Sequence, residues 1–298
     1  QAVSTYGVDY KDYDNDGDGY VDMFYMIFAG VGANTGEADD HIWPHKSTMY
    51  YKRWRTYACS CEYYSESSGI LDGIGTICHE FSHVLGLPDL YDTDYEGSGG
   101  QAQHPGDWEI MSGGSYNNYG RTPAAYSAYD RYASGFATPT VINAPGEYQL
   151  PALGESNQIM MIKSPLSKEF FLLENRQQTR WDAHIPGHGL LVARVDSSNV
   201  SVWTGNSVNN NPARLYYELL RAGRVMSGEG DASDPFPGTR GIPMLTNDTE
   251  AHLKTFNGTR NPWNLADIQE NNGVISFRVY PEGGIVADVE DFEAMPVT

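Results

Sequence analysis

Residues 79–89 read HEFSHVLGLPD, a set of residue types and spacings that can form a metal site. On an α-helix, His79 and His83 lie one turn apart on the same face, so both imidazoles can reach one ion. Gly86 ends the helix and allows a sharp turn, after which the carboxylate of Asp89 can return as a third ligand. Two imidazoles and a carboxylate leave a fourth tetrahedral position open for water, which favours zinc.

The residue that follows the first histidine predicts hydrolytic chemistry. Glu80 lies about 100° around the helix from His79, because an α-helix has 3.6 residues per turn. It borders the metal face without coordinating the ion. From there its carboxylate can take a proton from a water molecule and deliver it to a leaving amine. The alternative is a pair of surface histidines on an amphipathic helix.

The helix that positions these residues is expected over Gly69–Gly86. Its apolar residues recur with helical spacing on the side opposite His79 and His83, whereas the metal side carries small or polar residues. The apolar residues are Ile70, Leu71, Ile74, Ile77, Cys78, Phe81, Val84 and Leu85. A helix of this kind can form the floor of a cleft.

Residues 14–22, DNDGDGYVD, match the first part of a calcium-binding loop. The predicted ligands are the side chains of Asp14, Asp16, Asp18 and Asp22 and the backbone carbonyl of Tyr20. The twelfth position is Tyr25 in place of a bidentate Glu, so we expect a loop that leads into a strand and has no sensor behaviour. A cation would relieve the repulsion among these carboxylates. A solvated acidic turn is the alternative.

Composition excludes several classes of function. The chain has 298 residues, and 19 Lys and Arg against 39 Asp and Glu give a formal charge of −20. This charge repels phosphate backbones and anionic lipid, so we expect no nucleic-acid partner. No apolar run reaches the roughly 18–20 residues that a membrane helix needs, so we expect no membrane insertion.

The three cysteines leave two alternatives open. Cys59 or Cys61 can form a disulfide with Cys78, which would agree with an extracellular location. All three can equally be small buried residues with free thiols.

Other elements follow from local patterns. We expect a strand covered on both faces at 23–29 and further strands at 170–173, 190–195 and 274–279. A second helix is expected over 122–134, with Thr122 as its N-cap.

Beyond the metal motif, three further segments resemble the immune inhibitor A family of secreted bacterial metallopeptidases, a metzincin-like branch of the zincins. They are DNDGDGYVD at 14–22, DWEIMSGG at 107–114, and FLLENRQ at 171–177 followed by PGHGLL at 186–191. The resemblance extends to about Pro281.

The resemblance implies an α+β catalytic domain over residues 1–283, with an active-site helix and a β-rich C-terminal half. Its upper part would be 1–86 and its lower part 87–283. Residues 284–298 would be a tail or the start of a further module. It further implies an extracellular zinc endopeptidase acting on proteins or peptides.

The resemblance assigns roles to single residues as well. His79, His83 and Asp89 would bind zinc, Glu80 would be the general base, and Met111 would form the Met-turn beneath the metal. Some relatives carry a tyrosine two residues after this methionine, where Gly113 stands here. The nearby candidates are Tyr116, Tyr119 and Tyr126, and His45 is a further candidate for the cleft. Arg194 stands where the family often has a histidine.

The resemblance also predicts a partner for the chain itself. Zincin domains place a twisted sheet and a backing helix before the metal helix, but only two strand signals precede Gly69. We therefore expect the first strand and backing helix to precede Gln1, so that an N-terminal fragment or propeptide would be a partner. The alternative function is a calcium-stabilised surface-binding protein with an inactive zinc site.

Overall fold

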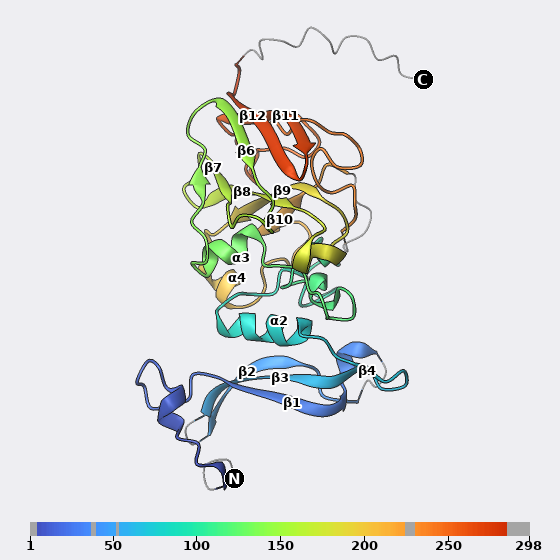
Figure 1. Cartoon of the computed structure of the whole chain (residues 1–298). Coiled ribbons are helices and arrows are strands. Elements are labelled where there is room, and N and C mark those ends of the chain that lie inside the picture. The colour runs from blue at the N-terminus through green and yellow to red at the C-terminus, as the bar shows by residue number, and fades with distance from the viewer. Residues whose placement is uncertain (1–4, 37–39, 52–53, 224–229, 285–298) are drawn as a thin grey trace.

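The computed structural model describes residues 5–36, 40–51, 54–223 and 230–284. Three sheets and a few short helices make up this part of the chain, so the predicted α+β class is confirmed. The N-terminal sheet lies at one end, helix α2 (Gly75–Val84) lies over it, and the two C-terminal sheets lie beyond the helix (Figure 1). No helix in the described part of the chain is long and apolar enough to cross a bilayer.

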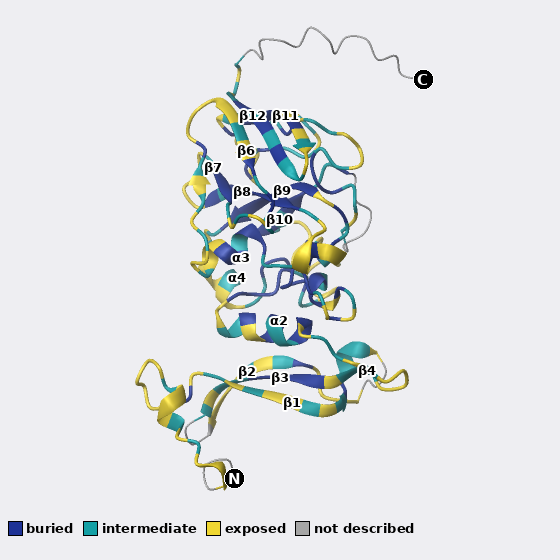
Figure 2. Cartoon of the chain, in the orientation of Figure 1, coloured by how far each residue is buried: buried dark blue, intermediate teal, exposed yellow. Residues whose placement is uncertain are grey.

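The N-terminal sheet contains the strand expected at 23–29. Its strands are β1 (Phe24–Val31), β2 (His45–Tyr51), β3 (Trp54–Ser65) and β4 (Ile70–Leu71). Their order is β1-β3-β2, with β4 paired to β3, and β1 runs parallel to β3. The expectation that this strand is covered on both faces is wrong. Because α2 packs mainly on β2 and β3, most residues of β1 are exposed or half-buried (Figure 2). Its last residue, Val31, is buried.

Helix α2 begins six residues later than expected because Ile70 and Leu71 pair with β3 instead. A close backbone approach sets its first residue. The amide of Gly75 donates to the carbonyl of Gly120 at 2.9 Å, and a Cβ on Gly75 would lie only 1.8 Å from the carbonyl oxygen of Ser115. Any larger residue at this position would therefore push the 115–120 loop away from the helix.

The predicted burial of α2 is reversed. Ile74, Phe81 and Leu85 on the apolar side are 41–43% exposed, whereas His79 and Glu80 on the opposite side are 9% and 6% exposed. Figure 2 shows exposed positions on this helix and on β1. The periodicity of the sequence therefore predicted the two faces of the helix correctly. It did not predict which of the two faces is covered by the rest of the chain.

The C-terminal half holds the main core. One sheet has the order β10-β9-β8-β7-β5 and the other β11-β12-β6. The bounds are β5 (Thr140–Val141), β6 (Gly146–Leu150), β7 (Met160–Lys163), β8 (Glu169–Arg176), β9 (Gly189–Asp196), β10 (Tyr217–Leu220), β11 (Trp263–Asn271) and β12 (Val274–Pro281). The strands expected at 170–173, 190–195 and 274–279 fall within β8, β9 and β12. Their side chains pack together in one apolar cluster.

Two short helices accompany these sheets, α3 (Ala128–Ala133) and α4 (Val200–Thr204). The helix expected from Thr122 is thus reduced to α3, which Ser127 caps together with Asp130. Thr122 instead contacts His184 through its hydroxyl at 2.9 Å. Hydrogen bonds of Ala124 to Gly114 and of Ala125 to Asp182 keep residues 122–126 out of a helix, and they outweigh the local helix signal.

The cysteines are free thiols, with Cys59 and Cys61 buried and Cys78 half-buried. Of the two alternatives, the structure has the one without a disulfide.

The buried side chain of Arg176 joins the loop at 107–111 to the C-terminal half. Arg176 at the end of β8 is fully buried and donates to both carboxylate oxygens of Asp182 at 2.6 and 2.8 Å. It also donates to the carbonyl of Trp108 at 3.1 Å. The guanidinium group of Arg176, on a core strand, therefore fixes the loop at residues 107–111.

Replacing Arg176 with methionine is expected to lower the free energy of unfolding by about 3–5 kcal/mol, because Asp182 then stays buried without its cation. Chemical denaturation measures this. The matched control is Arg180→Met, whose partner Glu155 and own side chain are 72% and 67% exposed, and which should cost less than about 1 kcal/mol. Equal losses in the two variants would contradict the importance of the buried pair.

Candidate metal centre and cleft

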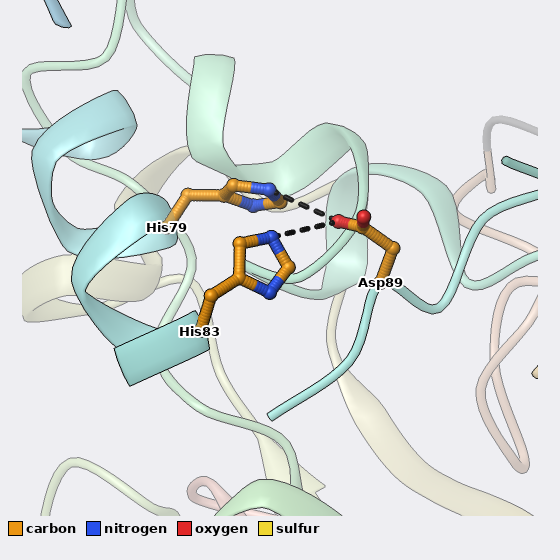
Figure 3. Close-up of side chains that lie close together, drawn as sticks. All are labelled: His79, His83 and Asp89. Carbon is orange, nitrogen blue, oxygen red and sulfur yellow. Dashed lines mark ion pairs between the residues drawn. The ribbon is translucent and has the colours of Figure 1, made fainter. Parts of the chain in front are cut away.

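Helix α2 and the bend after it bring the three predicted ligands together (Figure 3). Gly86 adopts a left-handed conformation with φ of +92°, and the chain then returns toward the helix. The Asp89 Oδ1 atom lies 3.0 Å from His79 Nε2 and 3.4 Å from His83 Nε2. One ligand atom from each residue lies within 4.8 Å of the others.

Backbone carbonyls orient both imidazole rings. His79 Nδ1 lies 2.8 Å from the carbonyl of Ile110, and His83 Nδ1 lies 2.8 Å from the carbonyl of Leu87. A carbonyl only accepts hydrogen bonds, so in each ring Nδ1 carries the proton. In the neutral rings the Nε2 lone pairs therefore face the carboxylate of Asp89.

This set of donors fits a divalent cation. Asp89 Oδ1 is buried and makes no hydrogen bond, although it faces two imidazole nitrogens. Burial opposes ionisation of Asp89, but the two histidines lower the pKa of its carboxyl below the usual value. Burial likewise works against protonation of His79, but Asp89 raises the pKa of this histidine. Zinc requires converging lone pairs of this kind, here from two imidazole nitrogens and one carboxylate oxygen.

Asn206 completes the cluster from a distant part of the chain. Its side-chain amide donates to Asp89 Oδ2, and its carbonyl oxygen accepts from the Asp89 backbone amide, both at 2.6 Å. This leaves Oδ1 to face the histidines. Sequence reasoning missed Asn206, because a residue 117 positions away carries no local signal of this contact.

Glu80 lies next to the cluster but outside it. Its side chain is 6% exposed and borders two pockets. Burial raises the pKa of Glu80 above the usual value, against the opposing effect of the two histidines. A carboxyl with a raised pKa holds a proton more readily than a solvated one, which suits a group that accepts and then releases it.

Met111 is fully buried in the loop that supports the site. Its carbonyl accepts from the Leu90 amide at 2.9 Å, and the preceding residue, Ile110, accepts from His79. The loop thereby contacts both the first histidine and the residue that follows Asp89. The assignment of Met111 as a Met-turn stays a prediction.

The tyrosine candidates differ in position. Tyr116 borders one of the pockets beside Glu80, whereas Tyr126 contacts the Ser82 hydroxyl at 2.5 Å and Tyr119 packs edge-on against Tyr64. Tyr91, which sequence reasoning did not single out, borders both pockets.

The two pockets meet at Glu80 and His79 and together form a cleft. One has a volume of about 300 Å³ and the other about 530 Å³. They share Trp43, Pro44 and Tyr91 as walls. A larger pocket, of about 730 Å³, shares no lining residue with the cleft and lies beside Trp263 and Arg260.

His45 and Arg194, the other residues singled out, occupy different surroundings. His45 borders the larger cleft pocket, and its Nε2 lies 2.9 Å from the Tyr57 hydroxyl. Arg194 borders neither cleft pocket. It lies on β9, where it is paired with Glu218.

Three of the aspartates in the predicted calcium loop converge. One oxygen each of Asp14, Asp16 and Asp18 lies within 4.8 Å of the others, and Asp14 Oδ1 is buried without a hydrogen bond. Asp22 instead accepts from the amide of Asn15, at 3.1 and 3.3 Å. The backbone amide of Tyr20 donates to Asp18.

Part of the chain that forms this cleft is similar to a family of peptidases. Residues 2–134 match the family model described as immune inhibitor A peptidase M6, catalytic domain. The predicted resemblance to immune inhibitor A peptidases is confirmed. The matched segment contains the aspartate loop, α2 and the loop of Met111.

Two bacterial relatives are similar to the same part of the chain. Immune inhibitor A of Bacillus thuringiensis subsp. alesti is 34% identical over 132 residues, which cover 39% of this chain and 19% of that protein. The pre-pro-metalloprotease PrtV of Vibrio cholerae serotype O1 is 31% identical over 144 residues, which cover 41% of this chain and 15% of that protein. The chain therefore spans less than a fifth of the length of these relatives. The resemblance predicted for the segments after residue 134 stays a prediction.

Replacing Asn206 with alanine is expected to weaken zinc binding about 10- to 100-fold, because Asp89 loses the partner that orients it. Competition with a chromogenic chelator measures the affinity. Asn210→Ala is the matched control, since Asn210 lies in the same loop but contacts Thr93. Unchanged zinc affinity in the Asn206 variant would contradict the role of this asparagine.

Proposed function

We propose that the chain is the catalytic part of an extracellular bacterial zinc endopeptidase, a zincin-like domain over residues 1–283. The observation that carries the proposal is the convergence of His79, His83 and Asp89 beside the buried carboxylate of Glu80, at the junction of two pockets. The family match and the names of the two relatives agree with this chemistry.

The proposed reaction is hydrolysis of a peptide bond. Zinc held by His79, His83 and Asp89 supplies a Lewis acid that polarises the carbonyl and acidifies water. The Glu80 carboxylate accepts a proton from the attacking water as the C–O bond forms. It then delivers this proton to the nitrogen as the C–N bond breaks, which yields an acid and an amine.

The shape of the cleft favours cleavage within a chain. Both pockets border His79 and Glu80, and we infer that a bound peptide extends into one pocket on each side of the scissile bond. A site that accepts only a chain end needs a wall on one side. Proteins and peptides are therefore the proposed substrates, and the residues lining the two pockets would contact their side chains.

We also propose that an N-terminal fragment or propeptide is a partner of the upper part of the domain. Exposed apolar side chains on α2 and β1, such as Phe81 and Ile27, lie on surfaces where such a partner could pack. The lower part would begin after Gly86. The tail expected at 284–298 lies, apart from Gly284, outside the described residues.

Glu80→Gln is the direct test of the mechanism. The amide cannot accept the proton, so we expect kcat on a protein substrate to fall at least about 100-fold while zinc content stays at one per chain. Glu62→Gln, an exposed change on β3, is the control and should retain turnover. Near-normal cleavage by the Glu80 variant would refute the base assignment. Absence of cleavage by the zinc-loaded parent protein, also when the N-terminal fragment is added, would favour a calcium-stabilised surface-binding protein.

A second proposed site is calcium at the aspartate loop, with Asp14, Asp16, Asp18 and Asp22 and the carbonyl of Tyr20 as ligands. The buried, unpartnered Oδ1 atom of Asp14 supports it. A weak site of the extracellular kind would suffice to neutralise the loop.

Calcium at ten times its dissociation constant is expected to stabilise the protein by about 1.4 kcal/mol, because it binds only the folded loop. Thermal unfolding with and without calcium measures this. The double variant Asp14→Asn, Asp16→Asn should lose the effect, whereas Asp12→Asn, in the preceding turn, should keep it. Equal calcium responses in the two variants would rule out the site.

A further inference from the structure

The two pockets of the cleft differ in charge. We call the smaller one the aspartate pocket, because Asp92 lies in its wall together with Tyr91, Tyr95 and Tyr116. We call the larger one the lysine pocket, because Lys46 and His45 lie in its wall. No lysine or arginine borders the aspartate pocket among the described residues. Apart from Glu80 and Asp89 at the centre, no carboxylate among them borders the lysine pocket.

Backbone amides hold the carboxyl group of Asp92 in place. Its carboxylate oxygens accept from the backbone amides of Asp94 at 3.1 Å and Ala102 at 2.9 Å, and the residue is 2% exposed. The aspartate pocket therefore has a fixed carboxyl group in its wall and, among the described residues, no lysine or arginine beside it.

Aromatic rings complete the aspartate pocket. Tyr95 and Tyr116 are 57% and 41% exposed, so their rings remain available to a ligand. The face of a tyrosine ring attracts a cation, and guanidinium groups also stack on it. A volume of about 300 Å³ accommodates one large side chain. These features together suit a long side chain that ends in a positive charge.

We propose that the aspartate pocket selects an arginine or lysine side chain of the substrate and that the lysine pocket disfavours one. This inference rests on the proposed peptidase function. It makes cleavage depend on the charge of the residue on one side of the scissile bond and adds Asp92 and Lys46 as specificity-determining residues. The formal charge of −20 also draws cationic peptides toward the protein.

The test compares arginine with citrulline, which has nearly the same shape but no charge. Fluorogenic peptides carry one or the other at each of the positions flanking the scissile bond, and kcat/KM is measured with the zinc-loaded protein. We expect arginine to be favoured about tenfold or more at one position, because desolvated charge pairs are strongly coupled. At a position on the other side of the bond, citrulline should be favoured.

Three variants test which residues cause the preference for charge. Asp92→Asn should bring the arginine-to-citrulline ratio at the selective position close to one. Gln101→Lys introduces a positive charge at the exposed rim of the same pocket, leaves the hydrogen bonds of Asp92 intact, and should lower the ratio as well. Lys46→Glu should raise the ratio on the other side of the bond. Glu147→Gln, an exposed change on β6, removes one negative charge outside the cleft and should change neither ratio.

The outcomes separate this inference from the proposed function. If the parent protein cleaves peptides with ratios near one at every position, the charge selection is refuted while the peptidase function stands. Ratios that survive both Asp92→Asn and Gln101→Lys also refute it, and if the asparagine variant does not fold, the lysine variant decides alone. If no peptide is cleaved at all, the peptidase function itself fails.

Discussion

The structure depends on one electrostatic constraint, the approach of a buried carboxylate to two imidazole nitrogens at the bend after α2. Asp89 Oδ1 lies 3.0 and 3.4 Å from the Nε2 atoms of His79 and His83. Backbone carbonyls hold the other nitrogen of each ring, so neither histidine can rotate away without losing a hydrogen bond. Positive charge at its centre would stabilise such a cluster, and this requirement fits the metal site that we propose.

The groups that enforce this geometry come from the C-terminal half. Asn206 fixes the carboxylate of Asp89, and the loop of Ile110 and Met111 supports the first histidine. The guanidinium of Arg176 in turn donates hydrogen bonds to the carboxylate of Asp182 and to the carbonyl of Trp108 in that loop. The metal helix alone would leave these partners solvated and mobile. The β-rich half therefore acts as the rigid support that preorganises the site.

The cleft lies where the N-terminal sheet meets this support. Trp43 and Pro44 come from the segment before β2, whereas Tyr91 follows the metal ligands, and all three border both pockets. The walls of the cleft thus come from opposite sides of α2. This explains why the two pockets can differ in charge although they share a centre, since Lys46 and Asp92 belong to different layers of the fold.

The local sequence determined which residues form the candidate metal centre. His79, His83 and the bend at Gly86 are close in sequence, so helix geometry alone brings them together. It also predicted the apolar strands β8, β9 and β12, whose hydrophobic runs allow few alternatives. Tertiary structure decided which face of α2 is buried and where Asn206 and the cleft walls lie. It also decided that residues 122–126 do not form a helix. These features depend on contacts between residues far apart in the chain, and periodicity carries no information about which distant surface will cover a given face.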